Sequence, residues 1–429
     1  MGRGTRQGRP RSAVGGRAGR WAWIVALGCG GSTTSSADTT GDDATGGGVT
    51  SAAATTTAGT TETTGNVTSS AATSTTGGVA EDTGRSTGEA PPAAPLQVHY
   101  LGVGGVVLRV GDDTVLTAPL YTNPSLLEVT LGDIAPDPAV VDAYLPQDWV
   151  APAKAILVGH AHHDHLMDVP IVWGYTDDAT IYGNQASGWI LESFALVPSD
   201  RVVVVNDPAA PLVDRRNCPG DDPCTGAAGG EAGTWIEVPE TSVRIRALCS
   251  SHPAQFLDVF HFGEGCLDTA PNVPPPAAAE WKEGSTIAYL VDFLDPDDGT
   301  VVFRVYYQDA PTEAPVGHPD ASLLSEKRVD LAVVNIGSYT AVADHPEAIL
   351  GALSPRFVIG GHWEDFFAPL DPPVAPIPFH PSPVDFDDRA LAVLAEPSPV
   401  PWTVDGTQTT VRYVRPQPGT TMTIPASTR

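Results

Sequence analysis

Basic residues are scarce in this sequence. Lys and Arg together number 23 against 51 Asp and Glu, which gives a formal net charge of -28 over 429 residues. A surface this acidic repels polyanions, so a role in binding nucleic acid is disfavoured. A small phosphate-containing substrate remains compatible with it, because bound divalent metal ions reverse the local electrostatic field.

Long apolar runs are missing near the N-terminus. The run from Trp21 to Leu27 is much shorter than the roughly 20 residues that cross a bilayer, so it does not predict a transmembrane helix. The first 29 residues hold six arginines and no acidic residue, a pattern typical of an export signal. Ala26–Cys29 resembles the lipoprotein box of bacteria, in which the cysteine is lipidated and becomes the new N-terminus. The resemblance implies an exported lipoprotein of the outer membrane or periplasm, held to the membrane by lipid on Cys29. The alternative is ordinary secretion, with Cys29 removed or idle.

Cysteine is rare, with five in the whole chain. Apart from Cys29, an even number remains, which in an exported chain suggests disulfide bonds: Cys218, Cys224, Cys249 and Cys266. The loop between the first two is rich in Pro, Gly and Asp, which favours pairing Cys218 with Cys224 and Cys249 with Cys266. A zinc site made by the same four is the alternative, and it lacks the short Cys-x-x-Cys spacing.

Large apolar residues are almost absent between residues 30 and 95, where Thr, Ser, Gly and Ala dominate. Such a segment cannot bury enough surface to offset the entropy that it would lose on ordering. We therefore expect a signal peptide over residues 1–29, a disordered tether over 30–95 and one large folded domain over 96–429.

The expected domain contains many short apolar runs with interspersed amphipathic stretches. The runs predict strands at Leu96–Leu101, Val106–Val110, Val115–Thr117, Ala155–Val158, Val202–Val205, Ser242–Leu248, Ser285–Phe293, Thr300–Tyr307, Leu331–Ile336 and Arg356–Ile359. A turn at Asp297–Gly299 predicts a hairpin between two of them. Helices are expected near Gln185–Ala195, Pro346–Leu353 and Asp388–Leu394. This pattern indicates an α/β or α+β fold with an extensive core.

A dense group of metal-ligand residue types follows the strand Ala155–Val158. It comprises His160, His162, Asp164 and His165. A loop that leaves a strand end can direct alternate residues the same way, so the first two are placed to bind one ion and the last two to bind a second. Imidazole and carboxylate ligands suit Zn²⁺, while Mn²⁺ and Fe²⁺ remain open. The sequence therefore predicts a binuclear metal site.

The motif His-x-His-x-Asp-His after an apolar strand resembles the metallo-β-lactamase superfamily. The resemblance spans about Leu96 to Pro372 and implies a four-layer αββα sandwich with metals at one edge. Asp330–Tyr339, His345–Ala348 and Gly361–Trp363 resemble one branch, which includes ascorbate-6-phosphate lactonases and the phospholipase D that acts on N-acyl-phosphatidylethanolamine.

The resemblance also implies the rest of the site. His252, which follows a strand, is the third ligand expected for the first metal, with His261 as its competitor. Asp309 is expected to bridge both ions, and His362 to complete the second metal. His345 is expected to contact the substrate. One family position differs: the early Thr-Asp-Pro is replaced here by a sequence with Ala118, so an acidic group that supports the metal loop is lost.

These residues predict a metal-dependent hydrolase. A hydroxide that bridges the two ions would attack an ester-type bond, a phosphodiester or a lactone, with Asp164 and Asp309 as the catalytic carboxylates that hold it. The substrate would be a small molecule or a lipid. An iron-dependent oxidoreductase resembling persulfide dioxygenases and a non-catalytic surface lipoprotein that keeps the fold are the alternatives, and metal analysis discriminates between the first of these and the hydrolase.

Overall fold

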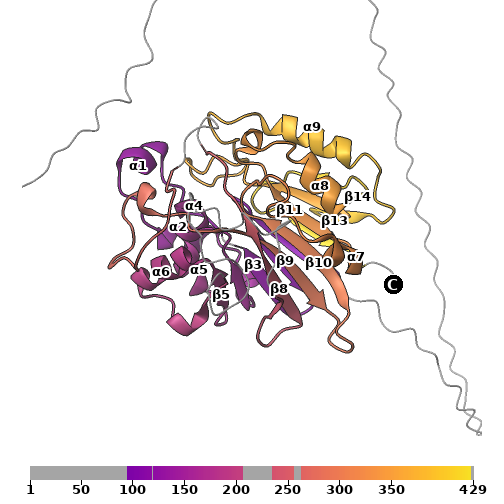
Figure 1. The fold of residues 1–429 in the computed structure, drawn as a ribbon, viewed down its shortest axis with the longest axis horizontal. Coiled ribbons are helices and arrows are strands. Elements are labelled where there is room, and N and C mark those ends of the chain that lie inside the picture. The colour runs from indigo at the N-terminus through magenta and orange to yellow at the C-terminus, as the bar shows by residue number, and fades with distance from the viewer. Residues whose placement is uncertain (1–93, 118, 206–233, 256–261, 427–429) are drawn as a thin grey trace, which may run out of the picture. The chain divides into compact units, whose positions relative to one another are not determined.

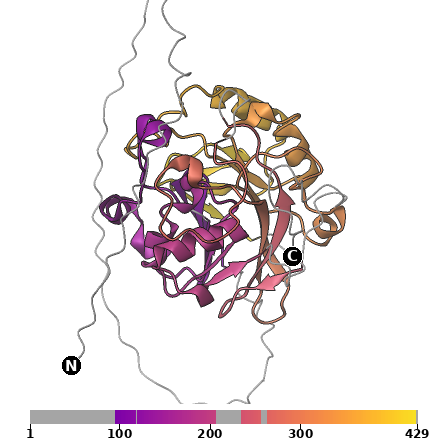
Figure 2. The same cartoon turned by 60° about the vertical axis from the view of Figure 1, so that its left-hand side comes forward.

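The computed structural model describes residues 94–117, 119–205, 234–255 and 262–426. The expected signal peptide and tether, together with Cys29, Ala118, Cys218, Cys224 and His261, lie outside the described residues. The architecture of the described part is shown in Figure 1 and, turned by 60°, in Figure 2.

The first half of the domain builds most of a nine-stranded mixed sheet. Its strand order is β14-β13-β16-β1-β2-β3-β4-β5-β6. The strands are β1 (Leu96–Gly102), β2 (Gly105–Val110), β3 (Asp113–Thr117), β4 (Ala155–Leu157), β5 (Thr180–Gly183), β6 (Val202–Val204), β13 (Trp402–Val404), β14 (Thr407–Thr409) and β16 (Thr421–Ile424). From β3 to β6 the neighbours are parallel, so the carboxyl ends of these strands meet at one edge of the sheet.

The second half builds a seven-stranded sheet in the order β15-β12-β11-β10-β9-β8-β7. Its strands are β7 (Ile236–Glu237), β8 (Val243–Ser250), β9 (Thr286–Leu294), β10 (Val301–Gln308), β11 (Leu331–Asn335), β12 (Phe357–Gly361) and β15 (Tyr413–Val414). The pair β9 and β10 is antiparallel, so the predicted hairpin at Asp297–Gly299 is confirmed. The strands β10, β11 and β12 are parallel and end at the same edge.

Helices cover the outer face of each sheet. On the first sheet lie α1 (Leu126–Leu131), α2 (Pro138–Tyr144), α3 (Gln147–Val150), α4 (His163–Leu166), α5 (Val169–Trp173) and α6 (Gln185–Phe194). On the second lie α7 (Ala321–Glu326), α8 (Glu347–Leu353) and α9 (Pro383–Val393). One apolar core fills the space between the sheets, and one further core lies between each sheet and its helices. The predicted four-layer αββα sandwich is therefore confirmed.

The predicted elements differ from the observed ones at their ends, and the short helices α1, α2, α3, α4, α5 and α7 were not predicted. The predicted helix Asp388–Leu394 begins earlier, at Pro383, because Ser382 caps it and a proline fits the first helical turn. The strands β5 and β7 and the four strands after residue 400 were not predicted. Of these, β16 pairs with both β1 and β13, so the end of the chain belongs to the first sheet.

Two further structural findings concern the cysteines and the helices. Cys249 and Cys266 are both disulfide-bonded, while the predicted pairing of the four cysteines remains a prediction. Among the described residues, no helix is both long and apolar enough to cross a membrane.

Candidate metal centre

The loop after β4 brings the predicted motif against the second sheet. The ring of His160 is completely buried, and its Nδ1 lies 2.6 Å from Oδ2 of Asp309 at the end of β10. Gly159 permits this approach, because a Cβ at that position would lie 2.2 Å from the Cβ of Asp309. His162 then begins the short helix α4, whose single turn carries Asp164 and His165 on the inner side of the loop.

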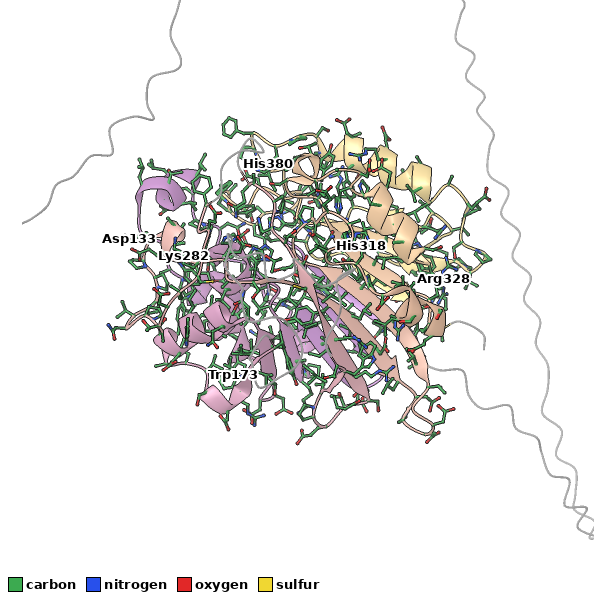
Figure 3. All side chains as sticks on the ribbon, viewed as in Figure 1. Asp133, Trp173, Lys282, His318, Arg328 and His380 are labelled. Carbon is green, nitrogen blue, oxygen red and sulfur yellow. The ribbon has the colours of Figure 1, made fainter. Side chains whose placement is uncertain are left out.

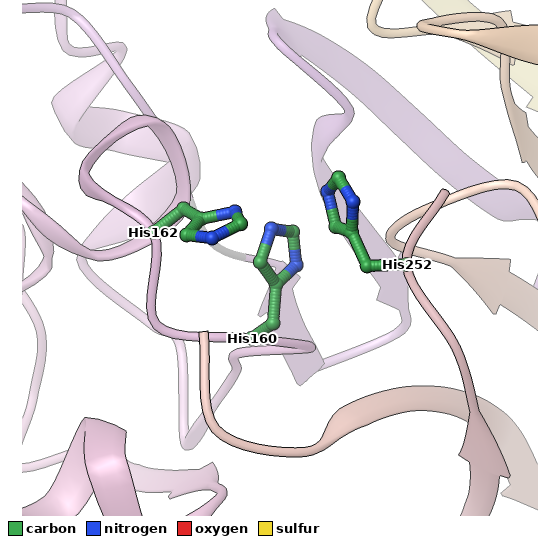
Figure 4. Close-up of side chains that lie close together, drawn as sticks. All are labelled: His160, His162 and His252. Atoms are coloured by element: carbon green, nitrogen blue, oxygen red, sulfur yellow. The ribbon is translucent and has the colours of Figure 1, made fainter. Parts of the chain in front are cut away.

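Strand ends of the second sheet supply the remaining predicted residues. His252 follows β8, Asp309 follows β10 and His362 follows β12. The structure brings all seven predicted side chains together in three overlapping groups, within each of which the potential ligand atoms lie within 4.8 Å of one another: His160, His162 and His252; His160, His165 and Asp309; Asp164, His165 and His362. Figure 4 shows the three rings of the first group directed toward a common point.

The first group contains only imidazoles. The ring centroids of His160 and His162 lie 4.6 Å apart, and that of His252 lies 4.7 Å from the first and 5.0 Å from the second. His252 is fixed through Nδ1, which lies 2.7 Å from the backbone oxygen of Pro253. Three imidazoles in this arrangement match the donor set of a tetrahedral zinc site that keeps its fourth position open.

The other two groups combine imidazole with carboxylate. His362 Nε2 lies 3.2 Å from Asp164 Oδ2 and 3.1 Å from His165 Nε2. Nδ1 of His165 lies 3.0 Å from Oδ1 of Asp309, and the other oxygen of that carboxylate faces His160. Asp309 thus stands between the first group and the third, where a bridging carboxylate is expected.

The charges of these side chains suit metal binding. Burial alone would raise the pKa of Asp164 and of Asp309, but the neighbouring histidines outweigh burial and hold both pKa values well below the usual range. Burial and the neighbouring His160 hold the pKa of His162 and of His252 well below the usual range. Two carboxylates that stay ionised and two imidazoles that stay neutral are the forms that ligate metals.

His165 differs from the other histidines. Burial would lower its pKa, but the carboxylates of Asp309 and Asp164 outweigh burial and raise that pKa to about 9. A metal ion that binds His165 at neutral pH must therefore displace a proton.

The chemistry of the donors supports a fit to metal ions. Nε2 of His160 and Nε2 of His162 are buried and have no hydrogen-bond partner among the described residues. Leaving buried polar atoms without a partner is costly, and it calls for an explanation such as an ion. The seven side chains therefore fit two divalent ions, although their assignment as ligands remains a proposal.

A surrounding shell of hydrogen bonds holds these donors in place, and the sequence analysis did not identify it. The hydroxyl of Tyr307 donates to Oδ1 of Asp309, and the side-chain amide of Asn335 donates to the backbone oxygen of the same aspartate. The amide nitrogen of Gln255 lies 3.1 Å from Nδ1 of His162. Such supporting contacts orient ligands and tune metal affinity. Tyr307 was detectable in principle, since it lies two residues before Asp309 on the same face of one strand.

His362 is held in an unusual backbone conformation. Its φ is 55°, in the left-handed region that non-glycine residues rarely adopt. The backbone N–H of His362 donates to the hydroxyl oxygen of Tyr100 at 3.1 Å. Tyr100 therefore holds the backbone of the residue that would complete the second metal site.

One further predicted residue, His345, meets a different environment. His345, predicted to contact substrate, is 1% exposed, with Nε2 lying 3.1 Å from the backbone oxygen of Asn335 and its ring against Phe386. This geometry supports the end of β11 and gives no direct support to substrate contact. Nearby, the carboxylate of Asp168 accepts hydrogen bonds from the backbone N–H groups of Tyr121 and Thr122 and so anchors that loop.

Comparisons with known proteins extend to the fold alone. No family model and no curated protein matches the sequence. A novel metallo hydrolase from the archaeon Ignicoccus hospitalis is similar in structure, with a TM-score of 0.43, 14% identity and coverage of 77% of this chain and 98% of that one. Zn²⁺-bound PqqB from Methylobacterium extorquens has a TM-score of 0.35 at 8% identity, covering 76% and 99%. A protein of Thermotoga maritima placed in the metallo-β-lactamase superfamily has a TM-score of 0.28 at 12% identity, covering 68% and 84%.

Proposed function

We propose that this chain is a hydrolase that uses two divalent metal ions, most simply Zn²⁺, to cleave an ester-type bond, a phosphodiester or a lactone. The observation that carries the proposal is the convergence of seven buried or half-buried imidazoles and carboxylates from four strand ends on one small volume. The first and second groups share His160, and the second and third share His165. An ion bound by one group would therefore also fix a side chain of the next group. That overlap favours a binuclear centre over an isolated ion.

Each protein group has a distinct role in this proposal. His160, His162 and His252 would hold the first ion, Asp164, His165 and His362 the second, and Asp309 would face both. When bound, the metals would lower the pKa of a water molecule and stabilise charge that develops on a substrate oxygen. Ionised carboxylates accept hydrogen bonds only, so Asp164 and Asp309 can orient a water molecule by accepting its hydrogens.

The side chains around the centre keep bulk water away from it. Asp309 is 2% exposed and His165 1%, and the ring of Phe366 lies 5.3 Å from that of His362. A water-poor site strengthens electrostatic interactions with a reacting group. This arrangement supports catalysis more than loose metal scavenging by surface histidines.

Metal content and hydrolysis by the full chain test the proposal. We expect about two metal ions per chain by elemental analysis, and metal-dependent cleavage of bis-p-nitrophenyl phosphate, lactones or p-nitrophenyl esters. His162→Ala and Asp164→Ala should each lower kcat/KM by at least about 100-fold, since first-sphere ligands matter more than their supporting contacts. His318→Ala is the matched control, because His318 is also buried and does not belong to any of the three groups. Less than one metal per chain, or activity that neither ligand change lowers, would contradict the proposal.

A further inference from the structure

The strand β11 ends beside the residue that would complete the second metal. In the parallel pair of β11 and β12, Asn335 lies opposite Gly361, and His362 follows directly. Asn335 is 4% exposed and continues the row of Leu331 and Val333, which faces the core between the sheets. The side chain of Asn335 therefore points inward, toward the layer that contains the candidate metal centre.

Two contacts fix Asn335 and leave one polar atom over. Its side-chain Nδ2 donates to the backbone oxygen of Asp309, and its own backbone oxygen lies 3.1 Å from Nε2 of His345. The first contact also determines which way the amide is turned, because an oxygen in the place of Nδ2 could not donate and would repel the oxygen of Asp309. The remaining acceptor, Oδ1, is buried and has no hydrogen-bond partner among the described residues.

The ring of His362 offers the complementary group. Its Nε2 faces the other members of its ligand group, with Oδ2 of Asp164 at 3.2 Å and Nε2 of His165 at 3.1 Å. Its Nδ1, at the other edge of the ring, is buried and has no partner within the described part of the chain. A neutral imidazole carries one proton, so an ion on Nε2 requires that proton on Nδ1, where a ligating histidine normally donates it to an acceptor.

Gly337 shows that these two atoms border the same space. A Cβ at this position would lie 3.2 Å from Oδ1 of Asn335 and 3.3 Å from Nδ1 of His362. Both atoms are thus near one point, where a small turn of either side chain, or one bridging water molecule, joins them. A missing partner alone does not indicate such a role: Nε2 of His318, labelled in Figure 3, is also buried without a partner among the described residues, and His318 belongs to none of the three groups.

We propose that Asn335 is a positioning residue of the metal centre, whose Oδ1 accepts a hydrogen bond from Nδ1–H of His362, directly or through one water molecule. The inference rests on the proposed function, because it concerns a ligand of the second ion. The bond holds the proton of the ring on Nδ1 and keeps the lone pair of Nε2 directed toward Asp164 and His165. Since Nδ2 of the same amide holds Asp309, Asn335 connects the carboxylate between the two ions to a ligand of the second.

The imidazole proton of the zinc-loaded full chain provides the first test. We expect an NMR signal from Nδ1–H of His362 that exchanges slowly with water and is identified by its loss in His362→Gln. Gly337→Ala places a methyl group against both atoms, and alanine fits the backbone there because the φ of Gly337 is not positive. In this variant and in Asn335→Leu the signal should shift and exchange faster. Gly188→Ala is the matched control, since its Cβ would be equally crowded, at 3.1 Å from Val204, and would not contact a ligand group.

Metal affinity gives a second readout. With a chromophoric chelator as competitor, Gly337→Ala should weaken binding of the second Zn²⁺ about 10–100-fold and leave the ion at the three-histidine group unchanged. Asn335→Asp keeps an acceptor at this position, so it should restore the Nδ1–H signal that Asn335→Leu alters. If Asn335→Leu does not fold, Gly337→Ala still tests the bond, because it retains both side chains of the pair.

The outcomes separate this inference from the proposed function. Two Zn²⁺ per chain, with the Nδ1–H signal and both affinities unchanged in Gly337→Ala, would overturn the role of Asn335 and leave the hydrolase intact. Equal effects of Gly337→Ala and Gly188→Ala would also overturn it, since crowding alone would then explain the loss. Two bound ions and the expected signal, but no hydrolysis of any substrate, would instead remove the proposed function and leave Asn335 as a positioning residue of a metal site.

Discussion

At the scale of single residues, the candidate site depends on contacts that the motif itself does not contain. Tyr100 lies on β1, far in sequence from His362, yet its hydroxyl accepts from the backbone of His362 and of Gly104. A Cβ on Gly361 would already lie 3.4 Å from that hydroxyl, so β12 ends directly against the tyrosine. The left-handed backbone of His362 therefore persists because its surroundings fix it.

The Tyr100→Phe variant tests this positioning role. Removing the hydroxyl leaves the backbone N–H of His362 without its partner, so the imidazole ring of His362 is held less firmly. We expect the affinity for the ion bound by Asp164, His165 and His362 to fall about 10–100-fold, with the affinity at the three-histidine group unchanged. Competition with a chromophoric chelator measures the two affinities separately.

Tyr306→Phe is the control for the loss of a buried hydroxyl. Tyr306 is as buried as Tyr100, and its hydroxyl donates to the oxygen of Gly317 at 2.8 Å, without contact to His362. The two variants should lose similar stability. If both weaken the second metal equally, or if neither does, Tyr100 has no specific positioning role.

At the scale of elements, the end of the chain completes the first sheet. The strand β16 lies between β13 and β1, with Met422 opposite both Val98 and Val404. Met422 is 1% exposed and packs into the core between the sheets, while its neighbour Thr423 points the other way and is partly exposed. A strand that is paired on both sides belongs to the folding unit and is not an appendage.

A pair of alanine variants on β16 tests its contribution. We expect Met422→Ala to lower the free energy of unfolding by about 2–4 kcal/mol, because it leaves a cavity in the core between the sheets. Thr423→Ala should cost less than about 1 kcal/mol, since that side chain is partly exposed. Urea unfolding of the full chain, followed by tryptophan fluorescence, gives both values. Equal losses would show that β16 does not pack as the structure indicates.

The sequence predicts the elements that carry strong apolar patterns and misses those that do not. Runs such as Ala155–Leu157 and Leu331–Asn335 are buried along their whole length, so composition alone identifies them. The strand β16 has the sequence Thr-Met-Thr-Ile, because only one of its faces is buried. The strand β14 contains only Thr and Gln, because most of it is exposed to solvent. Their strand character comes from pairing with distant segments, which the local sequence does not record.

The same limit applies to the candidate site. The cluster from His160 to His165 is visible because its members are adjacent in sequence. His252, Asp309 and His362 could be selected only through the family resemblance, and the structure brings them to the cluster. The contact of Tyr100 with His362 joins two strands that are distant in sequence, so no spacing rule could have indicated it.

At the scale of the whole molecule, the candidate centre lies where the two sheets meet. The metal loop belongs to the first sheet, but the second sheet holds it: the N–H of Ile287 donates to the oxygen of Gly159 at 2.8 Å, and the hydroxyl of Tyr289 donates to the oxygen of Val158 at 3.0 Å. The segment around Glu283 adds another contact, because its backbone oxygen accepts from the N–H of Ala161 at 3.0 Å. Packing between the sheets therefore sets the distances within the centre.

The pH dependence of global stability should report on one of these contacts. Burial raises the pKa of Glu283 to about 8 from its ordinary value of 4.5, while a hydrogen bond from Thr286 opposes the rise. The folded chain thus keeps this proton up to about pH 8, whereas the unfolded chain releases it near pH 4.5. The stabilising contribution is complete below pH 4.5 and is lost as the pH rises through 8, by at most about 1.4 kcal/mol per pH unit.

Glu283→Gln cannot release a proton, so its stability should change less between pH 5 and pH 8 than that of the original chain. The free energy of unfolding of both chains is measured with urea, with chelator present to remove bound metal. We expect the value for the original chain, minus that for the variant, to fall steadily from pH 5 to pH 8. Glu237→Gln, at an exposed position on β7, should show no such trend. A difference that stays constant from pH 5 to pH 8 would mean that Glu283 is ionised in the folded protein. The segment that contacts the metal loop would then carry a buried charge, and its burial would lower the stability of the fold.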